Sequence, residues 1–147
     1  GYERRQIPHA LDAVGVLFPR REGRRALAAT FSSSKWEGRA PEGKALVRVF
    51  VGGHRDPEAL KLSDPELVAL ARQELETLLG VQGEPLFSRV FRYERSNPQP
   101  TVGHLRRVAE LRELSPPNLH FAGAPFDGVG IPDCVRQAEA VAARIAG

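Results

Sequence analysis

Cysteine is nearly absent from this sequence, because only Cys134 among the 147 residues carries a thiol. One cysteine can form neither an intrachain disulfide nor the several-thiolate cage of a structural zinc site. No apolar run approaches the roughly 20 residues that cross a bilayer, and no charged start is followed by a short apolar segment typical of a secretory leader. The sequence therefore predicts a cytoplasmic protein without a transmembrane segment, and it leaves peripheral membrane contact open.

Charges of one sign are not concentrated in any part of the sequence either. The 21 basic and 18 acidic side chains give a formal net charge of +3, and both signs are interspersed along the chain. A nucleic-acid-binding domain normally gathers its basic residues on one surface. The densest basic stretch, residues 20–25, falls where a turn between two apolar runs is expected, which favours a solvated hairpin tip. No nucleic-acid partner is predicted.

Metal-ligand patterns are also missing. The four histidines lack the spacing of a metal site and have no cysteine or carboxylate cluster beside them. No metal site is predicted, and we interpret the histidines as structural. Cys134 fits best as a small buried residue, since a lone cysteine behaves most often as an apolar side chain.

Three short β-prone runs occupy the first third of the chain. Residues 14–18, 26–33 and 46–51 are apolar and β-branched, and turn-forming residues separate them. They predict three strands that pair antiparallel. Residues 86–93, rich in aromatic and β-branched side chains, predict a further strand, and residues 119–122 predict a short one before Gly123.

Helical spacing appears in three places. Ser63 with Glu66 three residues later forms a capping-box signature, and the apolar repeat that follows ends at Gly80. A second helix is predicted over residues 103–114, before the Pro116-Pro117 pair. A third covers residues 134–145 and places on one face Val135, Ala138, Val141, Ala142 and Ile145. The predicted order is β-β-β-α-β-α-β-α.

The glycine-rich loop before the third helix is the best candidate for chemistry. A buried strand that runs through such a loop into a helix points backbone N–H groups and a partial positive charge at one place, where an anion can bind. Gly123, Gly128 and Gly130 allow a ligand to approach the backbone closely, and Pro132 and Asp133 suit the first helical turn. Such loops are common in α/β domains, so spacing alone leaves a structural helix entrance as the alternative.

The amino-acid sequence of this loop is more specific than the spacing of its glycines. Residues 121–136 read Phe-Ala-Gly-Ala-Pro-Phe-Asp-Gly-Val-Gly-Ile-Pro-Asp-Cys-Val-Arg and closely resemble the C-terminal FAD-binding motif of the protoporphyrinogen and coproporphyrinogen oxidases of haem biosynthesis. The resemblance continues upstream in residues 31–36, in residues 39–44 and in the run ending at Gly52-Gly53, which look like the substrate-domain signature of that family. Residues 97–99 and 102–105 occupy the positions where that family has two further characteristic segments.

This resemblance implies a set of cofactor contacts. Val129, Gly130 and Ile131 would approach the isoalloxazine and the ribityl chain of FAD. The rest of the loop and the helix start would complete the pocket, and Tyr93 matches a position where many bacterial members have a tryptophan beside the flavin. The candidate cofactor-binding residues are Tyr93, Gly123, Asp127, Gly128, Val129, Gly130, Ile131 and Pro132. No side chain is nominated as a catalytic acid or base.

The resemblance also implies a fold and an activity. It predicts an α+β chain in which an antiparallel sheet with flanking helices, residues 1–100, is part of a substrate-binding domain. Residues 101–147 would be the C-terminal helix-strand-helix of an FAD-binding α/β domain. The implied activity is oxidation of protoporphyrinogen IX or coproporphyrinogen III, with hydride equivalents passing to the flavin and oxygen as acceptor.

The dinucleotide-binding fingerprint Gly-x-Gly-x-x-Gly, which binds the FAD pyrophosphate after a strand, does not occur here. We therefore expect the chain to be the C-terminal part of such an oxidase and to bind FAD weakly or not at all by itself. The strand at residues 119–122 would lack its parallel neighbours, which makes self-association a hypothesis to test.

Two other functions remain as alternatives. Another flavin amine-oxidase-like enzyme could share this architecture, because a fold does not determine a substrate. A non-catalytic α+β module that binds a protein or a small ligand is the second alternative. It predicts a colourless protein whose melting temperature does not respond to FAD.

Overall fold

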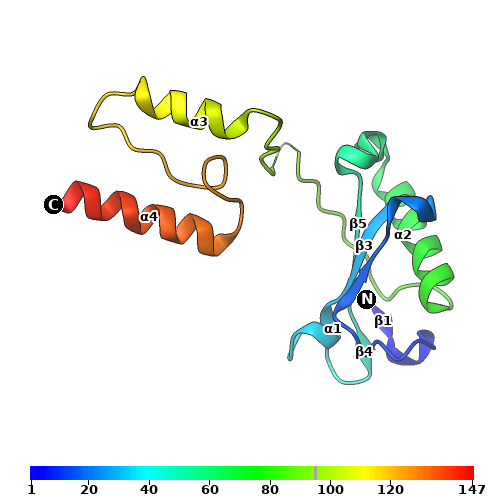
Figure 1. The fold of residues 1–147 in the computed structure, drawn as a ribbon. Helices are drawn as coiled ribbons and strands as arrows, with labels where there is room; N and C mark the ends of the chain where they lie inside the picture. The colour runs from blue at the N-terminus through cyan, green and yellow to red at the C-terminus, as the bar shows by residue number, and fades with distance from the viewer. Residues whose placement is uncertain (95) are drawn as a thin grey trace. The chain divides into compact units, whose positions relative to one another are not determined.

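The computed structural model describes residues 1–94 and 96–147. These residues form two compact units, Gly1–Arg92, called unit 1 below, and Tyr93–Gly147, called unit 2. Figure 1 shows the sheet and α2 in unit 1 and the helices α3 and α4 in unit 2. The fold class is α+β, as predicted.

Unit 1 is built on a three-stranded antiparallel sheet in the order β2-β3-β5. Its strands are β2 (Gly15–Leu17), β3 (Ala26–Phe31) and β5 (Val47–Val51). In the register, Ala29 of the central strand lies opposite Val16 on one side and Val49 on the other. Small and β-branched side chains of this kind pack well on a pleated surface. The three predicted strands are present, but the second ends at Phe31, because Ser32 and Ser33 belong to the helix that follows.

Several short elements complete unit 1. The strands β1 (Tyr2–Glu3) and β4 (Lys44–Ala45) form a separate two-stranded antiparallel sheet. The helix α1 (Ser32–Lys35) follows β3 directly. Single 3-10 turns occur at η1 (Arg4–Gln6), η2 (Arg20–Glu22), η3 (Gly53–Arg55) and η4 (Pro57–Lys61). These elements were not predicted, because each is too short to show a period in the sequence.

The hydrophobic core of unit 1 lies between the sheet and α2 (Asp64–Leu79). Buried leucines of α2 meet the inward side chains of β3 and the chain start. The cluster consists of Tyr2, Ile7, Leu11, Ala29, Phe31, Ala45, Leu75, Leu79 and Val81. Burial of apolar side chains at about 1.5–3 kcal/mol each is therefore the main force that holds unit 1 together.

Both ends of α2 follow from its sequence. The Ser63 N–H donates to Glu66 Oε2 over 2.7 Å, and the predicted capping box is present. At the other end Gly80 is left-handed, with φ 67°, and its N–H donates to the Glu76 carbonyl over 2.9 Å. Because glycine adopts this conformation without the Cβ penalty, the helix ends where the sequence predicts.

Unit 2 contains α3 (His104–Glu113) and α4 (Ile131–Ala146). The connection, residues 114–130, runs back along the unit, so both helices begin at the same end (Figure 1). Both helices were predicted, α4 with a later start. Little of unit 2 is buried, because Val108 is the only core hydrophobic side chain among its described residues.

Two predicted strands are wrong. Residues 86–93 have no strand ladder, and their backbone hydrogen bonds include Leu86 N–H to the Gly1 carbonyl at 2.8 Å and the Gly1 amine to the Phe87 carbonyl at 2.9 Å. Residues 119–122 form no strand either, and within the described part of unit 2 there is no strand for them to pair with. Local β propensity makes a strand only where a neighbouring strand supplies the ladder.

Candidate functional site

The predicted loop, residues 123–130, leads directly into α4. Gly130 is the N-cap residue with extended backbone, and the Cys134 N–H donates to its carbonyl over 3.0 Å as the first bond of the helix. Pro132 is the second helical residue, where its missing N–H leaves no helical bond unmade. Seven of the eight predicted cofactor residues therefore lie together on this loop and the first turn of α4.

Gly128 is required by the geometry of the loop. Its φ is +133°, and a Cβ at this position would lie 2.6 Å from Asp133 Oδ2 and 2.9 Å from Asp133 Cβ. Only glycine avoids both the strained backbone and the clash. The loop thus packs its backbone tightly against the first turn of α4.

Gln137 of α4 forms side-chain hydrogen bonds to the backbone of the loop. Its side chain is the buried polar group of unit 2, with 8% of the residue exposed. Oε1 accepts a hydrogen bond from the Gly123 N–H over 3.0 Å, and Nε2 donates to the Gly128 carbonyl over 3.5 Å. One side chain therefore links both ends of the glycine-rich turn. Sequence reasoning missed Gln137 because a glutamine in an amphipathic helix normally faces solvent.

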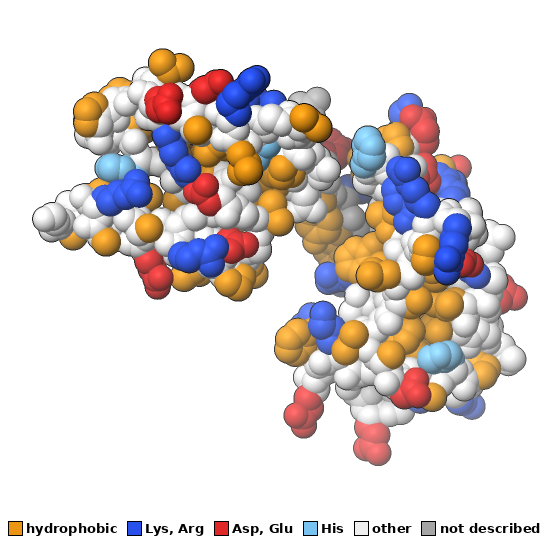
Figure 2. All heavy atoms as spheres, viewed as in Figure 1, with side chains coloured by type: hydrophobic (Ala, Val, Ile, Leu, Met, Phe, Trp, Pro, Cys, Tyr) orange, Lys and Arg blue, Asp and Glu red, His pale blue; other side chains and the backbone are white. Residues whose placement is uncertain are grey.

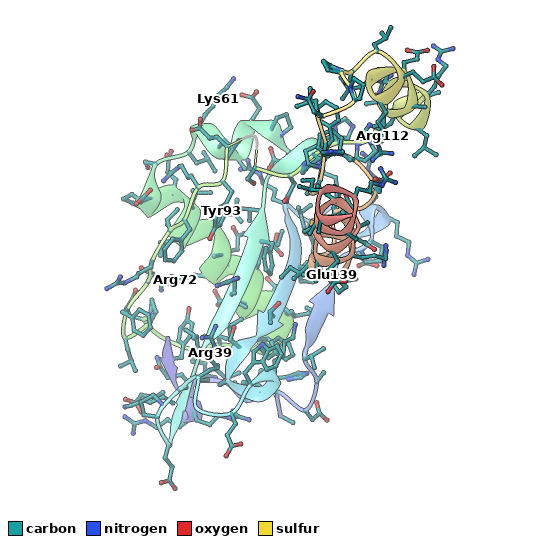
Figure 3. The ribbon with its side chains drawn as sticks, turned by 90° about the vertical axis from the view of Figure 1, so that its left-hand side faces the viewer. Arg39, Lys61, Arg72, Tyr93, Arg112 and Glu139 are labelled. Atoms are coloured by element: carbon teal, nitrogen blue, oxygen red, sulfur yellow. The ribbon has the colours of Figure 1, made fainter. Side chains whose placement is uncertain are left out.

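Arg112 of α3, labelled in Figure 3, also binds this loop. Its guanidinium binds both carboxylate oxygens of Asp127. Nη1 lies 3.1 Å from Oδ1, and Nη2 donates a hydrogen bond to Oδ2. Bidentate pairs of this kind constrain orientation as well as distance. The hydrogen bond from Arg112 is the main reason that the pKa of Asp127 lies below the ordinary aspartate value.

The Arg112–Asp127 pair predicts a pH dependence. Because the pKa of Asp127 is lowered in the folded state, its contribution to stability is present above the unfolded pKa and is lost as pH falls through the lowered folded value. We expect an NMR titration of the Asp127 carboxyl to show a midpoint below that of an ordinary aspartate. In Arg112→Gln the midpoint should rise toward the ordinary value. An unchanged midpoint in this variant would contradict the pairing.

Further contacts fix the segment before the glycines. The His104 ring Nε2 lies 3.4 Å from the Phe126 carbonyl oxygen, and the rings of Phe121 and Phe126 pack with centroids 5.4 Å apart. The Phe126 N–H donates to the Gly123 carbonyl over 3.1 Å, which closes a turn. The loop is therefore held by α3, by α4 and by its own turn before any ligand binds.

The loop and the helix start present features that fit a flavin. Val129 and Ile131, on either side of Gly130, are exposed to 60% and 80%. Within the described residues, no hydrogen-bond acceptor is found for the N–H groups of Val129, Gly130 and Ile131. Free amides at a helix start suit an anionic or carbonyl acceptor, and the two apolar side chains suit a flat apolar ring.

Tyr93 lies on the extended segment at the start of unit 2, with 69% of the residue exposed. Among the described residues no hydrogen bond joins Tyr93 to the loop. Its predicted place beside the flavin stays a prediction.

Two cavities, one in each unit, lie largely apart from the predicted residues. A cavity of about 470 Å³ in unit 2 lies between the connecting segment and α4 and contains Asp127 alone of the predicted set. Its other lining residues are Arg112, Ser115, Pro116, Pro117, Leu119, His120, Phe121, Arg136, Gln137, Ala140, Val141 and Arg144. A cavity of about 310 Å³ in unit 1 contains none of them.

Among the described residues, no helix combines the length and apolar character that crossing a membrane requires. In the same residues, no three His, Cys, Asp or Glu side chains gather as metal ligands.

Known proteins resemble this chain over almost its whole length. Residues 1–146 match the family model of the flavin containing amine oxidoreductases. A coproporphyrinogen III oxidase of Bacillus subtilis is 37% identical over 138 residues, which are 92% of this chain and 29% of the relative. A coproporphyrinogen III oxidase of Mycobacterium tuberculosis is 42% identical over 129 residues, 88% of this chain and 27% of the relative.

A plant protein and a solved structure extend the likeness. The chloroplastic protoporphyrinogen oxidase of Nicotiana tabacum is 30% identical over 99% of this chain and 28% of its own length. The crystal structure of a protein from Exiguobacterium sp. 255-15, assigned as a protoporphyrinogen oxidase, matches with a TM-score of 0.79 and 31% identity. That match covers 95% of this chain and 32% of the other.

The chain spans less than a third of the length of each of these relatives. The match to the family model nevertheless covers all but the last residue. The chain therefore belongs to the family of flavin containing amine oxidoreductases.

Proposed function

We propose that this chain is the C-terminal part of an FAD-dependent porphyrinogen oxidase of haem biosynthesis. In this proposal residues 1–100 belong to the substrate-binding domain and residues 101–147 to the FAD-binding domain. The named relatives support it, since each is called a coproporphyrinogen or protoporphyrinogen oxidase. The rest of the flavin site, with the pyrophosphate-binding glycines, is supplied by the part of such proteins that this chain does not span.

One observation carries the proposal for the flavin. The loop from Gly123 to Gly130 is held in place without a ligand, yet it exposes Val129 and Ile131 beside N–H groups that have no acceptor in the described residues. In this proposal Val129, Gly130 and Ile131 contact the isoalloxazine and the ribityl chain. Asp127 and Gly128 shape the loop, and Pro132 begins the helix behind it.

The flavin supplies the electron-accepting chemistry when it is bound. The residues of this chain orient the ring and keep water from one side of it, and none of them is assigned a proton-transfer step. Oxygen is the proposed electron acceptor. Because this chain contributes one wall of the site, we expect it to bind FAD weakly or not at all by itself.

Coproporphyrinogen III is the substrate that the comparisons favour. The bacterial coproporphyrinogen III oxidases named above are 37% and 42% identical to this chain, whereas the plant protoporphyrinogen oxidase is 30% identical. The shared name of these bacterial relatives is the support for coproporphyrinogen III. Protoporphyrinogen IX belongs in the same assay as the comparison substrate.

A chimaera tests the proposal directly. This chain would replace the segment that it matches in the Bacillus subtilis relative, and the purified protein would be examined for flavin absorbance and for oxygen-dependent formation of coproporphyrin from coproporphyrinogen III. We expect a yellow protein that forms the porphyrin. The isolated chain should be colourless, and FAD should change its melting temperature little.

A pair of matched variants locates the flavin in the chimaera. Val129→Asp places a charge on the proposed flavin wall, which consists of Val129, Gly130 and Ile131. FAD should then bind at least about 10-fold more weakly, because an ionised carboxylate is costly to bury. Leu114→Asp makes the same change at an exposed site at the end of α3 and should leave FAD affinity unchanged. A well-folded chimaera that is colourless and inactive with added FAD would reject the proposed function and favour a non-catalytic module.

A further inference from the structure

We propose that Gln137 is a positioning residue for the flavin wall, acting through the backbone of the loop rather than by touching the cofactor. This inference rests on the proposed function. Gln137 lies on α4 behind the loop, and its two amide atoms bind Gly123 and Gly128. These glycines flank the turn that leads to Val129, so the side chain determines where Val129 and Gly130 can lie.

The chemistry of the two bonds requires a carboxamide. Gly123 offers a backbone N–H and Gly128 offers a carbonyl, so the bridging group needs an acceptor at one end and a donor at the other. A rotated amide would set donor against donor and acceptor against acceptor, which fixes its orientation. A carboxylate keeps the acceptor and loses the donor, and an aliphatic side chain loses both.

The burial of Gln137 has no explanation in packing alone. On α4 the apolar residues Val135 and Ile145 are largely exposed, while the glutamine between them is the buried one. A helix that only needed a packing contact would bury an aliphatic side chain, because burying an amide is favourable only when its hydrogen bonds are made. The buried amide therefore serves the conformation of the loop.

Gly128 makes the arrangement sensitive to small changes. With φ +133° it occupies a backbone region that is open almost only to glycine, and glycine is also the residue with most freedom to leave it. The Gln137 amide donates to the Gly128 carbonyl oxygen, and the Cys134 thiol lies 3.9 Å from the same oxygen. Loss of the amide should release the turn without unfolding α4.

The first test uses this chain without cofactor. In NMR spectra the Gly123 amide should be protected from hydrogen exchange in the wild type, and the protection should fall about 10-fold or more in Gln137→Leu, because a buried hydrogen bond is lost. Gln73→Leu makes the same change on an exposed part of α2 and should leave Gly123 unchanged. Equal protection of Gly123 in wild type and Gln137→Leu would overturn the inference.

The second test uses Gln137→Glu and a pH profile. At neutral pH the new carboxylate repels the Gly128 carbonyl, so the loop should be disturbed. When acid protonates the carboxyl, it regains a donor, and the Gly123 and Gly128 chemical shifts should return toward the wild-type values at that pH. Gln137→Leu should show no such recovery. A role in general packing predicts no recovery in either variant, and that outcome also overturns the inference.

The third test separates this inference from the proposed function. In the chimaera, Gln137→Leu should weaken FAD binding about 10-fold and change the visible circular dichroism of the bound flavin, with α4 still helical. Wild-type chimaera that binds FAD together with a variant of equal affinity and spectrum would overturn the role of Gln137 and leave the proposed function intact. Failure of the folded wild-type chimaera to bind FAD would instead reject the flavin site, and the positioning role with it.

Discussion

Gly15→Ala is expected to destabilise unit 1 by about 2–5 kcal/mol, from backbone strain and steric overlap combined. Gly15 begins β2 with φ +154°, and a Cβ built there lies 2.3 Å from the Ala29 carbonyl oxygen and 3.0 Å from Thr30 Cα. Both atoms belong to the backbone of the central strand β3. Because neither can move without breaking the pairing of β2 with β3, the substitution cannot be accommodated by a side-chain rotation.

A change of this size is a large part of the roughly 5–15 kcal/mol that stabilises an ordinary domain. Chemical denaturation followed by far-ultraviolet circular dichroism, with Trp36 fluorescence as a second signal from unit 1, would measure it. The expected result is a lower denaturation midpoint with little change in the slope, because the folded state loses stability while the area exposed on unfolding stays similar.

Gly23→Ala is the matched control. Gly23 also has a positive φ, +65°, but no atom lies within 4 Å of its Cβ position. Only the left-handed backbone is then penalised, by about 1–2 kcal/mol for a residue with a Cβ. If both variants were destabilised equally, the overlap with Ala29 would not be the cause.

The parts of the fold that were predicted correctly have their causes close together in the sequence. The start of α2 is encoded by Ser63 and Glu66, and its end by Gly80. Likewise β3 and β5 are short apolar runs between turn residues. Signals of this kind need no knowledge of distant partners, which is why they survive in a single sequence.

The parts that were missed depend on partners that a sequence does not reveal. Residues 119–122 have the composition of a strand, but a strand needs a ladder, and the described part of unit 2 provides none. The apolar face predicted for α4 follows the correct period, yet Val135 and Ile145 remain largely exposed. Periodicity shows that a face is apolar and does not show what covers it.

The candidate site divides in the same way. The residues from Gly123 to Pro132 are contiguous and were predicted from the amino-acid sequence of the loop. Arg112 and Gln137, which hold that loop, come from separate helices and have no motif of their own. Their roles depend on folded distances, so only the structure could identify them. Figure 2 shows hydrophobic side chains at the surface of unit 2.

Hydrogen exchange is expected to separate the two units of the isolated chain. The central amides of α2 should exchange at least about 100-fold more slowly than those of α4, because exchange follows the local free energy of opening. Helix α2 buries Leu67, Leu75 and Leu79, whereas Gln137 is the only buried residue of α4. Three buried leucines at about 1.5–3 kcal/mol each account for a difference larger than the two decades expected.

Exchange measured by mass spectrometry on peptides from α2 and α4 would test this, with intrinsic rates corrected for sequence. Leu75→Ala is the control, since a cavity in the core of unit 1 should speed exchange in α2 and leave α4 unchanged. Equal protection of both helices in the wild type would contradict the expectation.

The same measurement on the chimaera connects stability to the proposed function. If the exposed apolar face of α4 is covered by the remainder of an oxidase, the α4 amides should become as slow as those of α2. Added FAD should slow the loop amides of residues 123–130 further, because a ligand that binds only the folded state stabilises it in proportion to the logarithm of its concentration over its Kd. If exchange in α4 slows but FAD does not affect the loop, the predicted packing surface of α4 is supported and the proposed flavin contact of the loop is contradicted.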